Sequence, residues 1–180
     1  MEVYNILKII DRDVETQLSR IIILIYELSG KEFNARIKGI NKIAKLDFLL
    51  KYPTYLNEIL SASNTNVRVS IESFENDSIE TLMSSYLYTP WDMKYRKYFN
   101  LLISKDLISI GFEDDDYYIQ ITSKGVSLVQ SLYENKLFNE FQKRASVIRT
   151  HFGSYTDNYL SKIFYDRIPE LTTLTKNDSV

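Results

Sequence analysis

The stretch from residue 90 to residue 125 constrains the fold most strongly, because its pattern changes from helical to strand-like and back again. Residues 93–106 carry aromatic and aliphatic side chains at helical spacing. Two short β-rich runs follow, at residues 107–110 and 117–121, and the acidic turn from Glu113 to Asp116 separates them. This order of helix, strand, turn, strand and helix is that of the second half of a winged-helix domain. We therefore expect a small β-hairpin, the wing, between two helices.

The rest of the chain is expected to be mostly helical, because only five glycines and three prolines occur among 180 residues. Tyr52-Pro53 should end one helix, since proline biases the residue before it away from the helical region. Gly30 suits the position just after another helix. A loop is expected at residues 61–66, and alternation at residues 67–71 allows a strand. The expected helices cover residues 14–28, 40–51, 55–60, 93–106 and 126–148, with a last one ending before Pro169.

Local signals also suggest how the later helices begin and how far they extend. Thr122 or Ser123 is suited to cap the helix after the hairpin. Apolar residues at three- and four-residue spacing from Val126 to Ile148 predict one helix of more than twenty residues. Ser154, with an acid three residues later at Asp157, resembles a capping box for the last helix.

These elements together predict a mainly α-helical protein with minor β-structure. Its expected parts are a helical half at 1–66, a winged-helix-like half at 67–125, long helices at 126–171 and a disordered tail at 172–180. We expect these parts to form one compact unit.

The composition excludes several kinds of chemistry. The chain has no cysteine, a single histidine and a formal net charge of −2, which excludes disulfides, thiolate nucleophiles, thiolate metal sites and multi-histidine sites. His151 is expected to have a capping or surface role rather than that of a general base. The longest apolar run, from Ile21 to Tyr26, is too short to span a bilayer. We expect a cytoplasmic protein without a cofactor.

No motif in the chain predicts an enzyme. The carboxylates from Glu113 to Asp116 lack the alternate spacing and the glycine turn of a calcium loop, so a solvated hairpin tip is the favoured interpretation. A metal-dependent activity at this turn is the one enzymatic alternative. Gly30-Lys31 lacks the first glycine and the hydroxyl residue of a phosphate loop.

Nucleic-acid binding is a weaker hypothesis that rests on one basic helix. Lys94, Arg96, Lys97 and Lys105 are candidate phosphate contacts. A winged helix usually docks its wing against the phosphate backbone, and the acidic turn would be repelled there. We expect DNA contact to be weak or to occur only within a larger complex.

The aromatic content favours protein contacts instead. The chain has 14 tyrosines, nine phenylalanines and one tryptophan, and exposed tyrosine and tryptophan are favoured at protein interfaces. They cluster in the region 86–99 and again in 155–165. The candidate partner-interface residues are Trp91, Tyr95, Tyr98, Tyr159, Phe164 and Tyr165.

Four segments, in this order and spacing, resemble a known family. They are KLDFLLKYPTYLN at 45–57, WDMKYRKYFNLLISKDLISIG at 91–111, YYIQITSKG at 117–125 and IFYDRIPEL at 163–171. The chain resembles the middle component of bacterial ABC-three-component (Lamassu-type) defence systems over roughly residues 13–171. The aliphatic-Tyr-Pro helix ending and the Tyr-x-x-x-Pro-Glu pattern near the end are the more distinctive pieces.

The resemblance implies a function through partners. It implies a winged-helix accessory subunit that links an SMC-like coiled-coil ATPase to an effector, often a nuclease, in anti-phage or anti-plasmid immunity. The family's motifs are structural, so no catalytic residue carries over. The alternative is a winged-helix transcriptional regulator that binds DNA on its own.

Overall fold

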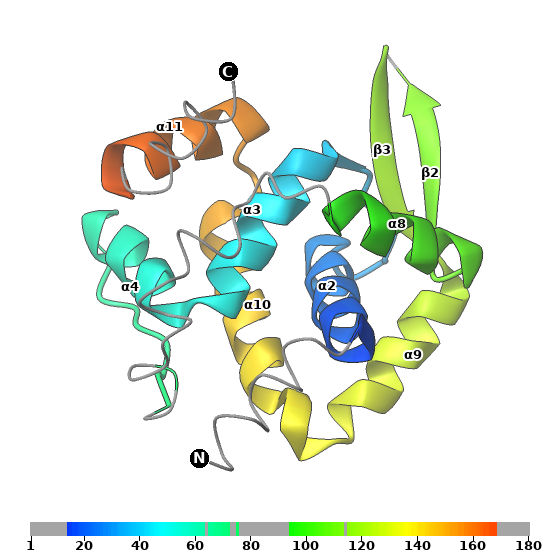
Figure 1. Cartoon of the computed structure of the whole chain (residues 1–180), viewed down its shortest axis with the longest axis horizontal. Helices are drawn as coiled ribbons and strands as arrows, with labels where there is room; N and C mark the ends of the chain where they lie inside the picture. The colour runs from blue at the N-terminus through cyan, green and yellow to red at the C-terminus, as the bar shows by residue number, and fades with distance from the viewer. Residues whose placement is uncertain (1–13, 64, 73–74, 76–93, 114, 169–180) are drawn as a thin grey trace. The chain divides into compact units, whose positions relative to one another are not determined.

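The elements of the chain are those of a mainly helical protein with one small sheet (Figure 1). The structure is a computed structural model, and it describes residues 14–63, 65–72, 75, 94–113 and 115–168. The chain divides into two compact units. Unit 1 comprises residues 1–40 and 93–142, and unit 2 comprises residues 41–92 and 143–180. Each unit therefore combines segments that are distant in the sequence.

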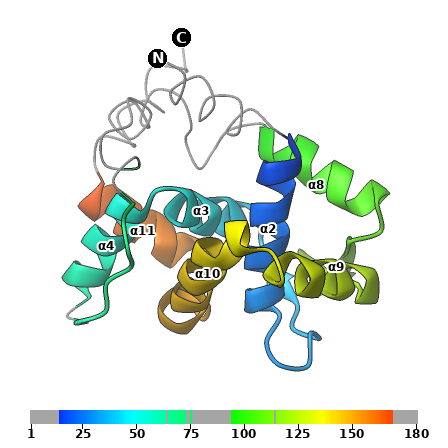
Figure 2. The same ribbon diagram turned by 90° about the horizontal axis from the view of Figure 1, so that it is seen from below.

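Unit 1 is built around helix α2 (Val14–Leu28), with which α8 (Lys94–Ser104) and α9 (Ser123–Tyr133) are in contact (Figure 2). The isoleucine-rich run from Ile21 to Ile25 is fully buried, because apolar residues lie all around this part of the helix. Gly30 follows the helix with φ of +75°, a left-handed conformation that glycine adopts without steric cost. The helix predicted at 14–28 is confirmed.

The sheet of unit 1 has three antiparallel strands in the order β1-β3-β2. Strand β1 (Ile37–Lys38) pairs with β3 (Asp116–Ile121), and β3 pairs along its whole length with β2 (Ile108–Glu113). The predicted hairpin is thus confirmed, but its strands reach further toward the tip than expected. Glu113 and Asp116 are paired strand residues, not turn residues.

Helix α9 begins at a cap that the sequence predicted. The backbone N–H of Gly125 donates to Oγ1 of Thr122 at 3.0 Å, and the same hydroxyl donates to the carbonyl of Asp106 at 2.7 Å. A Cβ at Gly125 would lie 2.2 Å from the carbonyl oxygen of Leu107, so glycine allows this close approach of helix and chain. The cap and the glycine together fix where α9 starts beside the hairpin.

Unit 2 contains α4 (Pro53–Ala62), α11 (Asp157–Arg167) and most of α3 (Ile40–Lys51) and α10 (Asn139–Phe152). The rings of Phe48 and Phe164 have centroids 5.8 Å apart and join α3 to α11 in the core. The predicted bounds of α3 are confirmed. Helix α4 begins at Pro53, earlier than expected, because proline is well suited to the first helical position.

Two lysines of α3 bind the end of α10 and the start of α11 in unit 2. Nζ of Lys42 donates to the carbonyl of Gly153 at 2.7 Å, and Nζ of Lys45 donates to Oδ1 of Asp157 at 2.5 Å. Burial lowers the pKa of Lys42, and the carboxylate of Asp157 opposes that shift. These contacts satisfy a part-buried carbonyl at a helix end and pair a buried charge.

The possible strand at residues 67–71 is absent, and the described part of this segment has no regular secondary structure. The backbone of Val69 is instead satisfied by one side chain. Nδ2 of Asn57 donates to the carbonyl of Val69 at 3.0 Å, and the N–H of Val69 donates to Oδ1 of Asn57 at 2.8 Å. The loop expected at 61–66 also starts later, since α4 continues to Ala62.

The uninterrupted helix predicted from Val126 to Ile148 is wrong. Helix α9 ends at Tyr133, a 3-10 turn η1 (Lys136–Phe138) follows, and α10 then begins at Asn139. The N–H of Leu137 donates to Oδ1 of Asn135 at 3.1 Å, so a local side-chain cap competes with continuation of the helix.

The cap predicted for the last helix is also displaced. The N–H of Tyr159 donates to Oγ1 of Thr156 at 3.2 Å, which makes Thr156 the N-cap instead of Ser154. Pro169 and the tail at 172–180 lie outside the described residues. Over the part of the chain that the structure describes, no helix has the length and apolar character needed to cross a membrane.

Candidate protein interface

The hairpin of β2 and β3 exposes an apolar surface of unit 1. Strand residues that face each other lie on the same side of a sheet, so the pairs Ile108–Ile121, Ile110–Ile119 and Phe112–Tyr117 form one face. Burial decreases along this face from base to tip. Ile108, Ile119 and Ile121 are buried, Ile110 is partly exposed, and Phe112 and Tyr117 are 59% and 62% exposed.

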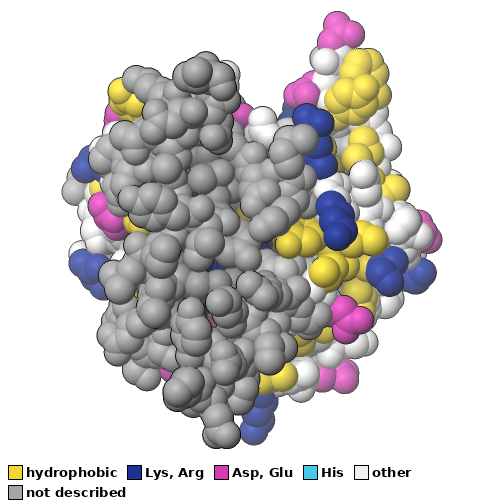
Figure 3. All heavy atoms as spheres, in the orientation of Figure 1, with side chains coloured by type: hydrophobic (Ala, Val, Ile, Leu, Met, Phe, Trp, Pro, Cys, Tyr) yellow, Lys and Arg dark blue, Asp and Glu magenta, His cyan; other side chains and the backbone are white. Residues whose placement is uncertain are grey.

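The two exposed rings support each other across the strands. The centroids of Phe112 and Tyr117 are 4.9 Å apart, at an interplanar angle of 59°. Figure 3 shows hydrophobic side chains along the hairpin and acidic side chains at its tip. We name this surface, formed by Ile110, Phe112 and Tyr117, the wing face.

On the other side of the hairpin, a guanidinium group stacks on an aromatic ring. The ring of Tyr118 lies over Gly111, and the guanidinium of Arg36 lies 4.9 Å from the centroid of that ring. Arg36 also forms an ion pair with Glu113. The hydrogen bond and charge of Arg36 hold the pKa of the Glu113 carboxyl below its usual range. Arg36 therefore ties the start of β1 to the outer end of the hairpin.

The tip beyond the wing face is acidic. Asp115 has φ of +60°, a left-handed conformation that aspartate tolerates at a turn, and its side chain is exposed. Oδ1 of Asp116 accepts from the N–H of Tyr117 at 2.9 Å. Asp116 pairs with Glu113, so its side chain lies on the Tyr118 side of the hairpin, opposite the aromatic pair. The exposed carboxylates of Asp115 and Asp116 therefore lie at the tip, past the end of the wing face.

The candidate interface residues of the sequence fall in different places. Tyr95 and Tyr98 of α8 are half-buried, with ring centroids 6.2 Å apart. Tyr159 and Tyr165 of α11 are 50% and 63% exposed. Trp91 lies outside the described residues.

Phe164 requires a correction, because it is fully buried and contacts Phe48 in the core of unit 2. A buried core ring is not available to a partner, so Phe164 is not retained as an interface residue. The wing face was missed by the sequence argument, although alternation at Ile108, Ile110 and Phe112 carried a signal for it.

The candidate phosphate contacts lie on or just after α8. Arg96, Lys97 and Lys105 are exposed, and Lys94 is the first residue of the helix. Lys124 lies beside Lys105, and its Nζ donates to the carbonyl of Lys105 at 2.8 Å. Exposed cations of this kind are compatible with a solvated helix face as well as with phosphate contact.

No metal site is formed by the residues that the structure describes, since no three His, Asp or Glu side chains among them are grouped to hold an ion. His151 is half-buried near the end of α10, and its ring centroid is 6.2 Å from that of Phe152. The last turn of a helix favours a basic residue, in agreement with a capping or surface role.

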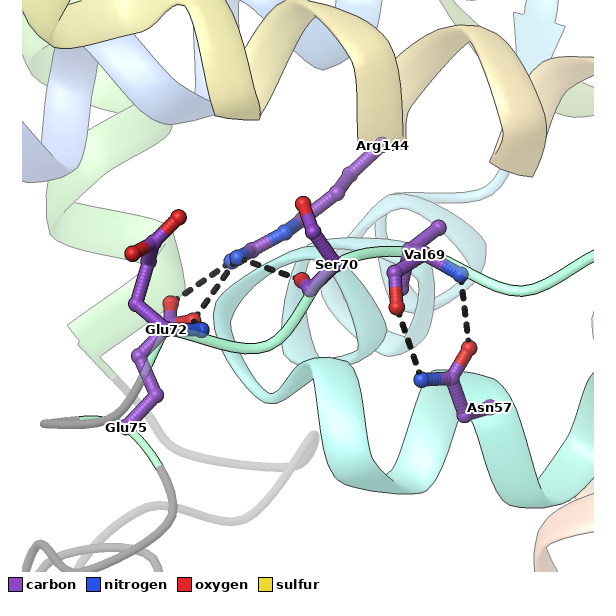
Figure 4. A network of polar contacts seen from close by, with 6 residues as sticks. All are labelled: Asn57, Val69, Ser70, Glu72, Glu75 and Arg144. Carbon is purple, nitrogen blue, oxygen red and sulfur yellow. Dashed lines mark hydrogen bonds and ion pairs between the residues drawn. The ribbon is translucent and has the colours of Figure 1, made fainter.

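A fully buried arginine of unit 2 belongs to a structural network (Figure 4). Nη1 and Nη2 of Arg144 donate to the two carboxylate oxygens of Glu75 at 2.7 and 2.8 Å, and Nη2 also donates to the carbonyl of Ser70 at 3.0 Å. Arg144 is 1% exposed. This bidentate pair attaches the irregular segment to α10, while Nε of Arg144 is buried without a hydrogen-bond partner.

Comparison with known proteins gives one match. The family model of the ABC-three component (ABC-3C) system Middle Component 4 matches residues 28–150, more than half of the chain. The matched range includes the complete hairpin and the helices α3, α4, α8 and α9. Neither a curated protein nor a solved structure matches the chain.

Proposed function

Because the chain belongs to the Middle Component 4 family of ABC-three component (ABC-3C) systems, we propose that it is a non-catalytic adaptor subunit that joins two partner proteins. Membership of such a family implies a multi-component system with partner proteins. The proposed partners are an SMC-like coiled-coil ATPase and an effector nuclease encoded in the same operon. Their proposed task is bacterial defence against phages or plasmids, in the cytoplasm.

The family match carries this proposal, and the arrangement of unit 1 supports it. In chain order, unit 1 contains helix α2, strand β1, helix α8, the hairpin β2–β3 and helix α9. Its sheet has the order β1-β3-β2. We propose that unit 1 is a winged-helix domain with an insertion between β1 and α8. Such a domain can present its wing to a protein as well as to DNA.

The surfaces proposed for the partners carry aromatic residues, and each unit has its own set. In unit 1 they are Tyr95 and Tyr98 of α8, with Trp91 before the helix, and in unit 2 they are Tyr159 and Tyr165 of α11. Tyrosine gives a large contact area at low cost in side-chain entropy, which favours its use at interfaces.

Co-expression with the products of the adjacent genes tests the adaptor function. The expected result is one peak in size-exclusion chromatography that contains the chain, the ATPase and the effector. Tyr159→Ser with Tyr165→Ser should weaken this assembly, whereas Lys162→Ser, at an exposed position of the same helix, should leave it intact. Separate elution of the three wild-type proteins would contradict the proposal.

A DNA-binding regulator is the second candidate, because Arg96 and Lys97 are exposed on the helix that precedes the wing. It requires duplex binding that weakens with salt and on replacement of both residues by glutamine. The carboxylates at the tip of the hairpin oppose docking of a phosphate backbone. Fluorescence anisotropy with labelled duplex DNA at low salt distinguishes the two candidate functions, because only the regulator requires the isolated chain to bind DNA.

A further inference from the structure

The wing face continues the hydrophobic core past the helices of unit 1. Ile119 and Ile108 are buried at its base, but Phe112 and Tyr117 lie beyond the last packed residues and keep more than half of their surface exposed. Burying such rings yields a large hydrophobic gain, because the gain grows with the apolar surface removed from water. Two adjacent large rings on one exposed strand pair are therefore a favourable contact surface.

The charges around the wing face indicate what kind of partner it suits. Asp115 and Asp116 are exposed at the tip, just beyond the end of the wing face, and Glu113 lies at the end of β2. Arg36 is paired with Glu113, and the charge of Lys38 also acts on Glu113 from the Tyr118 side of the hairpin. The excess negative charge is therefore that of the two aspartates at the tip. The faces of aromatic rings attract cations, and Lys and Arg place their aliphatic stems on apolar surface while their charged ends reach carboxylates.

From this charge complementarity we infer that the wing face docks a segment of a partner protein that is rich in lysine or arginine and carries an apolar residue between the charges. The inference deepens the proposed adaptor function by naming the chemistry that one partner presents to unit 1. The basic side chains stack on Phe112 and Tyr117 and extend toward the aspartates at the tip of the hairpin, and the apolar residue contacts Ile110. The same surface repels a phosphate backbone.

The test is an NMR titration of the whole ¹⁵N-labelled chain with a 12-residue peptide that alternates leucine with lysine and arginine. Amide shifts confined to the two strands of the hairpin are the expected result, with weaker binding at higher salt. The matched probe replaces every lysine and arginine by glutamate, and it should cause no shift at these amides. A short DNA duplex is the third probe.

Two double variants test the aromatic part and the acidic part of the surface separately. Phe112→Ser with Tyr117→Ser should weaken binding of the basic peptide at least tenfold, and Asp115→Asn with Asp116→Asn should weaken it about fivefold. Asp116→Asn keeps the acceptor for the N–H of Tyr117, so the turn is preserved. Leu137→Ser and Glu134→Gln are the controls, because both residues are exposed elsewhere in unit 1. They should leave the affinity unchanged.

Three outcomes would overturn the inference: hairpin amides that do not respond to the basic peptide, equal response to the acidic peptide, or stronger response to the duplex. None of these outcomes depends on whether the adaptor assembles with its partners. If the wild-type chain joins the three-protein complex but the wing-face variants, still folded by circular dichroism, join it equally well, the inference is wrong and the adaptor function stands.

Discussion

The ring of Tyr118 occupies the position that a side chain at Gly111 would take, directly across the hairpin. A Cβ at Gly111 would lie 2.2 Å from Cζ of Tyr118 and 2.3 Å from its hydroxyl oxygen, and the two residues are paired in the register of β2 and β3. A glycine in one strand and an aromatic residue opposite it therefore form one packing unit. Arg36 covers the ring of this unit at 4.9 Å.

Gly111→Ala should lower the free energy of unfolding by about 1 kcal/mol, because the ring must rotate away and lose its contact with Arg36. The expected loss is modest, since the clashing atoms are at the end of a side chain. Gly125→Ala should cost more, about 3 kcal/mol, because its Cβ would meet the backbone oxygen of Leu107 at 2.2 Å. Urea unfolding measures both changes, and an equal effect of the two substitutions would contradict this explanation.

Arg144→Met should destabilise the protein by about 3 kcal/mol, because it leaves the partly buried carboxylate of Glu75 without its bidentate partner. Arg144→Lys retains the charge but not the fork geometry, and should give an intermediate loss. Arg167→Met makes the same change at an exposed position of unit 2 and should shift the free energy of unfolding by less than about 0.5 kcal/mol. A similar loss of unfolding free energy for Arg144→Met and Arg167→Met would show that burial does not determine the size of the loss.

Tyr133→Phe should lower stability near neutral pH by about 1–2 kcal/mol, because the hydroxyl of Tyr133 donates to Oε1 of Glu27 at 2.9 Å. Burial, and then the charge of Glu27, raise the pKa of Tyr133. The folded state thus retains the proton that the unfolded state releases above its ordinary tyrosine pKa of about 10. The contribution is complete below that pH and is lost as the pH rises beyond it.

Urea unfolding of both proteins between pH 8 and pH 11 checks this effect. The difference in the free energy of unfolding between wild type and Tyr133→Phe should be constant up to about pH 10 and should then shrink. A difference that stays constant over the whole range would contradict a raised pKa for Tyr133.

Arg36→Gln should return the pKa of Glu113 toward its usual range, because the hydrogen bond and charge of Arg36 are the main causes of its depression. Carboxyl ¹³C chemical shifts measure that pKa directly. Lys38→Gln is the matched control, since Lys38 makes the smallest contribution to the shift, and it should move the pKa less.

The sign of the pH dependence follows from the lowered pKa of Glu113. The ion pair contributes stability above the pKa of the unfolded carboxyl, and this contribution is lost as the pH falls through the folded value. An acid unfolding curve of wild type that coincides with that of Arg36→Gln, together with an unchanged pKa, would exclude the ion pair in solution.

The sequence by itself determined the local elements of this protein. Tyr52-Pro53 set the boundary of α3, Thr122 set the start of α9, and the alternation on either side of the acidic turn gave the hairpin. Each of these signals acts over a few residues, through backbone conformation, a cap or the two-residue period of a strand. The family resemblance was readable for the same reason, because its motifs are local.

Only the tertiary structure decided which side chains are available to partners. Phe164 and Phe112 look alike in sequence, yet the first is buried against Phe48 and the second is 59% exposed. Arg144 and Glu75 are far apart in the chain, but they form a buried pair. Burial depends on which distant elements meet and where each of them ends, and no short-range pattern contains that information.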